Sequence, residues 1–202
     1  MKIIKIHTLL NSGNFEKSAT YQQIQDEIVT AIKCITNPIG ANGFYLNGQR
    51  KGNGVVPIKK AFIEQLDNSG WKNEHICDSI IKPRKIDSTK KLSTGKYFGV
   101  EWETGNISSS HRALNRLALG IRDGLLEGGV LVLPSRNMYE YLTDRVGNFQ
   151  EIENYFPIWE DLSCAFKARN QSALIKIIEI EHDGISNNVP PIPKGTDGRA
   201  RI

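Results

Sequence analysis

Two acidic residues, Glu101 and Glu103, stand two positions apart at the end of an aromatic and β-branched stretch at residues 97–102. This composition predicts a strand, and alternate side chains of a strand point to the same face. Gly105 then interrupts the strand, and Asn106 and the serines at 108–110 offer N-caps for a helix. Two carboxylates beside the positive end of a helix suit a divalent cation next to a phosphate. The same spacing is also typical of the solvated face of an amphipathic strand.

A third acidic residue, Asp87, follows the apolar Ile86 within a basic segment at residues 82–96. We expect Asp87 to complete the acidic group, and Asp78 is the competing candidate. Such a segment is often a solvated loop, but its place before the acidic strand also suits the phosphates of a polyanion. Against this one acid the segment holds six basic residues: Lys82, Arg84, Lys85, Lys90, Lys91 and Lys96.

The composition is that of a soluble globular chain, with 202 residues, 39% hydrophobic and 24% charged. The three cysteines are far apart and form no C-x-x-C motif, which favours reduced thiols and argues against a zinc site. No apolar run approaches the roughly 18 residues of a membrane span, so a cytoplasmic protein without a membrane partner is expected. The net charge of +4 is too small to indicate nucleic acid by itself.

Hydrophobic periodicity predicts alternating strands and helices, and hence a single α/β domain over residues 1–202. The helix predicted at 108–122 has a wide apolar stripe, which would serve core packing or a dimer interface. Proline and glycine from residue 186 onward predict a flexible basic arm at 186–202. The predicted helices are 22–35, 57–68, 108–122, 138–142 and 149–156, the last ended by Pro157, and the predicted strands are 2–7, 97–102, 130–134 and 174–180.

The segment around Glu101 carries an uncommon string, Gly-Val-Glu-Trp-Glu-Thr-Gly-Asn-Ile-Ser-Ser at residues 99–109, with His111-Arg112 just beyond it. Further strings stand in order at residues 54–59, 141–149 and 188–198. Together they resemble the BamHI family of type II restriction endonucleases. The match is continuous from about residue 99 to residue 156. Several rare strings in one order are far more specific than a bare Glu-x-Glu.

The resemblance implies a PD-(D/E)XK restriction-endonuclease-like core, with a central mixed β-sheet flanked by helices on both faces. It also implies a bacterial homodimer that cleaves duplex DNA at the palindrome GGATCC and leaves 5′ overhangs. One or two Mg²⁺ ions per subunit would be the cofactor. Glu103 departs from the general consensus, which has lysine at that position, but this departure is also found in BamHI.

The resemblance assigns the metal to Asp87, Glu101 and the main-chain carbonyl of Trp102. Glu103 would act on the attacking water as general base or serve as an additional ligand, and the sequence does not separate these roles. Glu74 resembles a further carboxylate near the family's site. Hard cations prefer such oxygen ligands.

The residues expected to recognise the DNA sequence are those that can hydrogen-bond to the edges of base pairs. Arginine can donate two hydrogen bonds to guanine, and a carboxylate can accept one from cytosine. An alternative for the adjacent Asp144 and Arg145 is a surface ion pair. By resemblance Arg112 and Arg145 read guanines, and Asp144 reads cytosines. The remaining predicted DNA contacts are Asn106 and Ser108 at the inner A·T pair, Lys59, and a minor-groove arm with Lys194, Gly195 and Asp197.

Three other functions remain open at this point. One is a nuclease of the same core with another GATC-centred target, which altered recognition residues would signal. Another is a non-cleaving, sequence-specific DNA-binding dimer, which degraded carboxylates would signal. The last is a dimeric interaction domain, whose DNA affinity would lack the steep salt dependence of phosphate binding.

Overall fold

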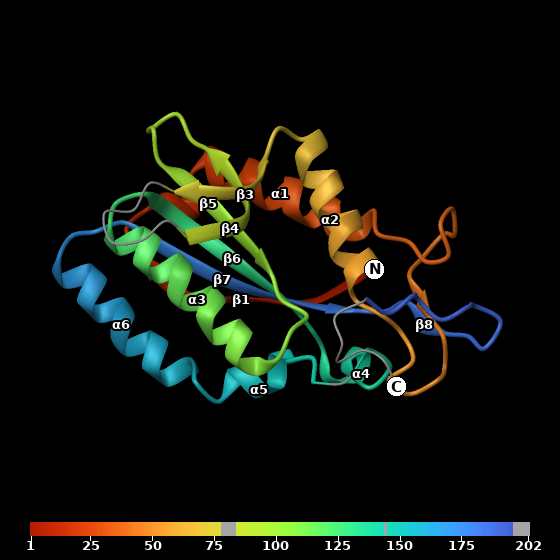
Figure 1. The fold of residues 1–202 in the computed structure, drawn as a ribbon. Helices are drawn as coiled ribbons and strands as arrows, with labels where there is room; N and C mark the ends of the chain where they lie inside the picture. The colour runs from red at the N-terminus through yellow and green to blue at the C-terminus, as the bar shows by residue number, and fades with distance from the viewer. Residues whose placement is uncertain (78–83, 144, 196–202) are drawn as a thin grey trace.

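The computed structural model describes residues 1–77, 84–143 and 145–195. Its centre is a six-stranded mixed sheet in the order β1-β7-β6-β5-β4-β3 (Figure 1). The pairs β5–β6 and β6–β7 are parallel, and the three outer pairs are antiparallel. The strands are β1 (Lys2–Ser12), β3 (Lys72–Cys77), β4 (Arg84–Lys91), β5 (Tyr97–Trp102), β6 (Leu126–Pro134) and β7 (Ala173–Glu181).

Helices cover both faces of this sheet, as predicted. One face carries α1 (Ala19–Lys33) and α2 (Val56–Asn68), and the other carries α3 (Ile107–Arg122) and α6 (Phe156–Ala168) (Figure 1). Short elements complete the described chain: η1 (Phe15–Lys17), α4 (Arg136–Tyr139), α5 (Phe149–Glu153), and a small parallel pair of β2 (Tyr45–Leu46) with β8 (Gly184–Ile185). Within the described residues, no helix has the length and apolar character needed to cross a membrane.

Each face of the sheet has its own hydrophobic core. Alternate side chains of a strand point to opposite faces of the sheet, so β5 contributes to both cores. On one face, Trp102 packs on Phe62 of α2 with ring centroids 4.7 Å apart. On the opposite face, α3 contributes Leu114 and Leu117, which are fully buried. Strand β5, which leads to the acidic residues, therefore packs between α2 on one face and α3 on the other.

Two glycines allow α3 to lie very close to the sheet. A Cβ at Gly129 of β6 would come within 2.6 Å of Leu117 Cδ2, and one at Gly99 of β5 would come within 2.9 Å of the same atom. Both positions consequently lack room for a side chain. Leu117 fills the space above them and sets the distance between α3 and the two central strands.

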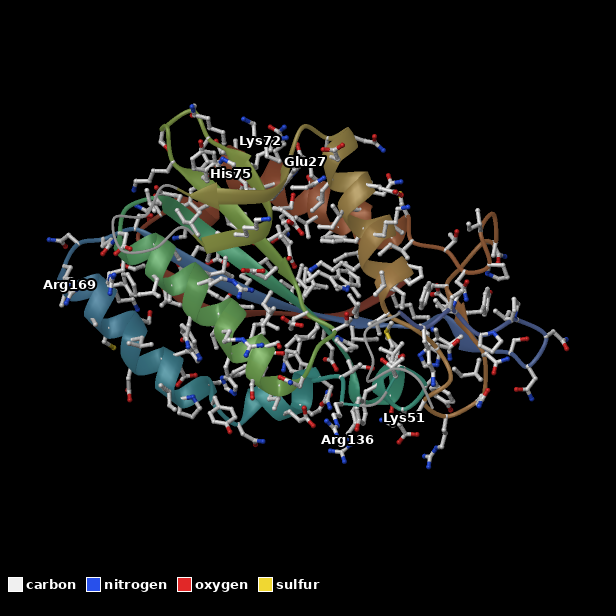
Figure 2. The ribbon with its side chains drawn as sticks, in the orientation of Figure 1. Glu27, Lys51, Lys72, His75, Arg136 and Arg169 are labelled. Atoms are coloured by element: carbon white, nitrogen blue, oxygen red, sulfur yellow. The ribbon has the colours of Figure 1, made fainter. Side chains whose placement is uncertain are left out.

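Two neighbouring strands at one side of the sheet, β3 at its edge and β4 beside it, were missed by periodicity. The interpretation of residues 82–96 as a solvated loop is wrong, since β4 occupies Arg84–Lys91 and pairs with both β3 and β5. Glu27 of α1, labelled in Figure 2, lies near this side of the sheet. It accepts from Trp71 Nε1 at 2.7 Å and from Lys90 Nζ at 2.9 Å. Part of the basic charge thus serves to hold β4 in place.

The helices after residue 135 also differ from the prediction. The helix predicted at 138–142 is the shorter α4, displaced toward the N-terminus because Ser135 caps it. The helix predicted at 149–156 ends at Glu153 instead. Pro157 does not stop a helix but lies in the first turn of α6, where a missing N–H costs nothing.

Leu117→Ala should destabilise the fold by roughly 2–5 kcal/mol, because the cavity left over the two glycines cannot be filled by neighbouring side chains. Urea unfolding would measure the difference. Ile39→Ala is the control, since Ile39 is 100% exposed and its truncation should leave stability nearly unchanged. Equal effects of the two substitutions would contradict this account of the packing.

Candidate active site

The acidic residues meet where β4 and β5 stop pairing. The ladder of these strands ends with the pair of Ser88 and Val100. Just beyond it, Asp87 Oδ2 accepts a hydrogen bond from the main-chain N–H of Trp102 at 2.9 Å. Asp87 is thereby fixed beside the end of β5, next to Glu101 and Glu103. The competing candidate, Asp78, lies outside the described residues.

Glu101 is a buried carboxylate, with 1% of the residue exposed. Burial raises its pKa from 4.5 to about 7; the hydrogen bond from Arg116 opposes this rise and the charge of Asp87 adds to it. Arg116 Nε lies 2.6 Å from Glu101 Oε1. This arginine comes from the side of α3 that faces the end of β5.

Glu103 folds back on the loop that follows the strand. Its Oε1 accepts from the N–H of Gly105 at 2.7 Å. A Cβ at Gly105 would lie 2.7 Å from that same oxygen, so only glycine allows this approach. Burial raises the pKa of Glu103, and the nearby Asp87 also raises it while Lys59 lowers it.

Two cations pair with carboxylates of this acidic group. Lys59 of α2 places Nζ 2.7 Å from Asp87 Oδ1, and Arg116 of α3 binds Glu101. Lys59 was predicted as a DNA contact, and the structure places it against a carboxylate of the candidate site. Within the described residues, no three His, Cys, Asp or Glu side chains converge to hold a metal ion by themselves. A metal here would need two carboxylates together with main-chain or water oxygens.

Glu74 stands apart from this group. It lies on the edge strand β3, is exposed, and pairs with Lys85 at 2.9 Å. Hydrogen bonding to Lys85 lowers its pKa, and the charge of Lys59 contributes to the same effect. In this structure Glu74 is therefore a peripheral carboxylate rather than one that touches Asp87 or Glu101.

The predicted recognition residues gather around the N-terminus of α3. Asn106 caps the helix by accepting from Ser109 N at 3.1 Å, and the neighbouring Ser108 and Arg112 are exposed. Gly147 N donates to Gly105 O at 2.6 Å. This bond holds the loop containing Arg145, which is also exposed, beside the start of α3. Asp144 lies outside the described residues.

The first part of the predicted arm is held against the body. Residues 186–195 form no helix or strand, yet Val189 and Ile192 are buried. Gly54 N donates to Ile192 O at 2.8 Å, just before α2 begins. Lys194 and Gly195 are thus placed near the helix that carries Lys59. Asp197 belongs to residues 196–202, which lie outside the described residues.

Arg116 is the site residue that sequence reasoning missed. It stands one turn after Arg112, and residues four apart share a helix face. That spacing was the one sequence feature that could have indicated Arg116. Hydrophobic periodicity does not predict how closely α3 packs on β5, and this close packing is what brings the guanidinium to Glu101.

Comparison with known proteins identifies the family. The model of the restriction endonuclease BamHI family matches residues 1–199. This chain belongs to the BamHI family of type II restriction endonucleases. It is therefore an enzyme, a site-specific deoxyribonuclease, and the predicted family is confirmed.

Two curated relatives support this placement, and one solved structure has a similar fold. The chain is 46% identical to the type II restriction enzyme OkrAI of Oceanobacter kriegii, covering 99% of each sequence. It is 36% identical to BamHI of Bacillus amyloliquefaciens, covering 92% of this chain and 86% of that one. The crystal structure of restriction endonuclease BglII complexed with a DNA 16-mer has a TM-score of 0.62 at 13% identity, covering 91% of this chain and 79% of that one. This last likeness confirms the fold.

Glu101→Gln should change the pH dependence of stability. Because folding raises the pKa of Glu101 from 4.5 to about 7, the protonated carboxyl stabilises the folded state at low pH. This contribution diminishes above about pH 4.5 and is lost as the pH rises through about 7. The variant lacks this group, so its free energy of unfolding relative to wild type should increase by roughly 1–3 kcal/mol over this range.

Urea unfolding in metal-free buffer at several pH values would measure this difference. Glu64→Gln serves as the control, since Glu64 is an exposed residue of α2 and should show no such trend. A difference between Glu101→Gln and wild type that stays constant with pH would contradict the burial argument.

Proposed function

We propose that this BamHI-family enzyme hydrolyses duplex DNA at GGATCC with Mg²⁺, leaving 5′ overhangs. The observation that carries the proposal is the hydrogen bond from Trp102 N to Asp87, because it sets two carboxylates together at the end of a central strand. The recognition strings shared with the family support GGATCC as the target.

The residues present fit Mg²⁺. The candidate donors are carboxylate oxygens of Asp87 and Glu101 and the carbonyl of Trp102, with no nitrogen or sulfur among them, and hard cations prefer such a set. When bound, the metal would polarise the phosphate and lower the pKa of a water. Stoichiometry of one or two ions per subunit is part of the same proposal.

Glu103 would accept the proton of the attacking water or serve as a further ligand. Its raised pKa suits the first role, since a base works best when its pKa lies near the operating pH. Lys59 and Arg116 stand beside the carboxylates and are the groups available to donate to a DNA phosphate that approaches. Glu74, at the edge of the sheet, would act only at a greater distance.

Base recognition is assigned to the surface around the start of α3. Arg112 and Arg145 would each donate to guanine, and Asp144 would accept from cytosine. Asn106 uses Oδ1 for its helix cap, so its Nδ2 group would face acceptors of the inner A·T pair, beside Ser108. Lys194, Gly195 and Asp197 would follow the minor groove.

A homodimer is proposed because a two-fold axis matches a palindromic target. The structure supports this with an exposed apolar face on α6, where Tyr155, Ile158 and Leu162 lie on one side. Tyr155 packs edge-on against His111 of α3, with ring centroids 4.4 Å apart. The dimer interface considered for the helix at 108–122 would therefore extend along α6.

Cleavage of plasmids carrying a single GGATCC or the variant AGATCT would test the chemistry and the readout together. Cutting at GGATCC alone, abolished by EDTA and reduced at least about 100-fold in Glu101→Gln, is the expected result. Cutting at other GATC-centred sites would overturn the recognition assignment. Tight, salt-sensitive binding without cutting would make the carboxylate assignment wrong.

Ile158→Glu should convert the dimer to monomer, because it places a charge in the apolar face that the second copy would cover. Sedimentation equilibrium of the DNA-free protein would report the mass. Ile39→Glu, at a fully exposed loop position, is the matched control and should stay dimeric. A wild-type protein that sediments as a monomer at micromolar concentration would contradict the proposed dimer.

A further inference from the structure

Asn53 is a fully buried polar residue at the junction of three chain segments. It is 0% exposed and makes four side-chain hydrogen bonds. Oδ1 accepts from Asn47 N at 3.2 Å and from Ile192 N at 3.3 Å. Nδ2 donates to Asn47 O at 3.0 Å and to Tyr141 O at 2.9 Å. An amide has two donor hydrogens and two acceptor lone pairs, so all of its capacity is used.

The main chain around Asn53 makes the same connections. Asn53 N donates to Tyr141 O at 3.0 Å, and an isolated parallel bridge joins Asn53 to Leu142. Gly54 N donates to Ile192 O. Asn47 adds a further hydrogen bond to the C-terminal segment, since its Nδ2 donates to Val189 O at 2.7 Å. Residues 47–54, 141–142 and 189–192 therefore form one hydrogen-bonded unit.

Each of these segments leads within a few residues to a proposed DNA contact. Arg145 stands three positions after Leu142, Lys194 stands two after Ile192, and Lys59 stands six after Asn53. The loop that carries Arg145, the start of the arm and the beginning of α2 are thus all connected to the side chain of Asn53. The side chain itself is buried and does not reach the surface.

We propose that Asn53 is a positioning residue for target selection, which sets the recognition loop, the arm and α2 in one fixed arrangement. This inference rests on the proposed cleavage at GGATCC. A buried amide that served stability alone would, when removed, lower cleavage at every site alike. A positioning residue changes the ratio between the cognate site and its one-base variants.

Two substitutions separate the contacts that Asn53 makes. Asn53→Asp keeps an acceptor oxygen for Ile192 N but replaces the donor group facing Tyr141 O with another acceptor. Asn53→Ala removes both. Asn11→Ala is the matched control, since Asn11 is a half-buried asparagine of β1, the edge strand that β7 and β6 separate from β5.

The experiment measures kcat/KM at GGATCC and at single-base variants, at a temperature where every protein is folded. The ratio between the two should fall at least tenfold in both Asn53 variants and stay at the wild-type value in Asn11→Ala. Limited trypsin digestion with mass spectrometry gives a second readout. Cleavage after Arg145 should increase in both variants, and cleavage after Lys194 should increase only in Asn53→Ala.

The outcomes distinguish the two proposals. A wild-type enzyme without preference for GGATCC would overturn the proposed function and this inference with it. A selective wild type whose Asn53 variants keep its ratio would overturn the inference alone. Unchanged trypsin cleavage after Arg145 in both variants would also contradict it, because the loop would then be held without Asn53.

Discussion

The burial of the Glu101 carboxylate is the constraint on which the rest of this structure depends. A carboxylate taken out of water is costly unless a charged or hydrogen-bonding partner compensates it. Here Arg116 supplies that partner, and it reaches Glu101 because α3 packs tightly over Gly99 and Gly129. The close packing of α3 on the sheet therefore both fills the core and supplies the counter-charge for Glu101.

The opposite face of the sheet contributes in the same way. Helix α2 belongs to the other hydrophobic core, and its Lys59 meets Asp87 at the end of the shared strands. The two cations thus approach the acidic group from opposite sides of the sheet. Asp87 itself is held by a main-chain N–H of β5, so its position follows the strand rather than a loop.

Local signals predicted the elements that carry the chemistry, and non-local contacts explain what was missed. Strand β5 and helix α3 are confirmed because alternation, Gly105 and the Asn106 cap all lie within a few residues. Strand β4 escaped detection because its lysines pair with distant acids such as Glu27. Arg116 could not be assigned before the distance between helix and sheet was known. The uncommon strings around residues 99–156 identified the family, which the comparisons confirm.

Only residues 103–106 separate β5 from α3, so a short connection joins the strand end with Glu101 to the helix with Arg112. Arg116 lies one turn beyond Arg112 and touches Glu101. In the proposed enzyme, a substitution that re-aims α3 toward a new base pair would therefore also disturb Glu101, a proposed metal ligand. The loop at Arg145 is joined to this connection through the hydrogen bond from Gly147 N to Gly105 O, and the arm is bonded to Gly54 and Asn47. In the proposed enzyme, these two segments could therefore change their base contacts with less effect on Glu101. Under the proposed function, the fold would thereby link the cleavage chemistry to the base pairs that α3 reads.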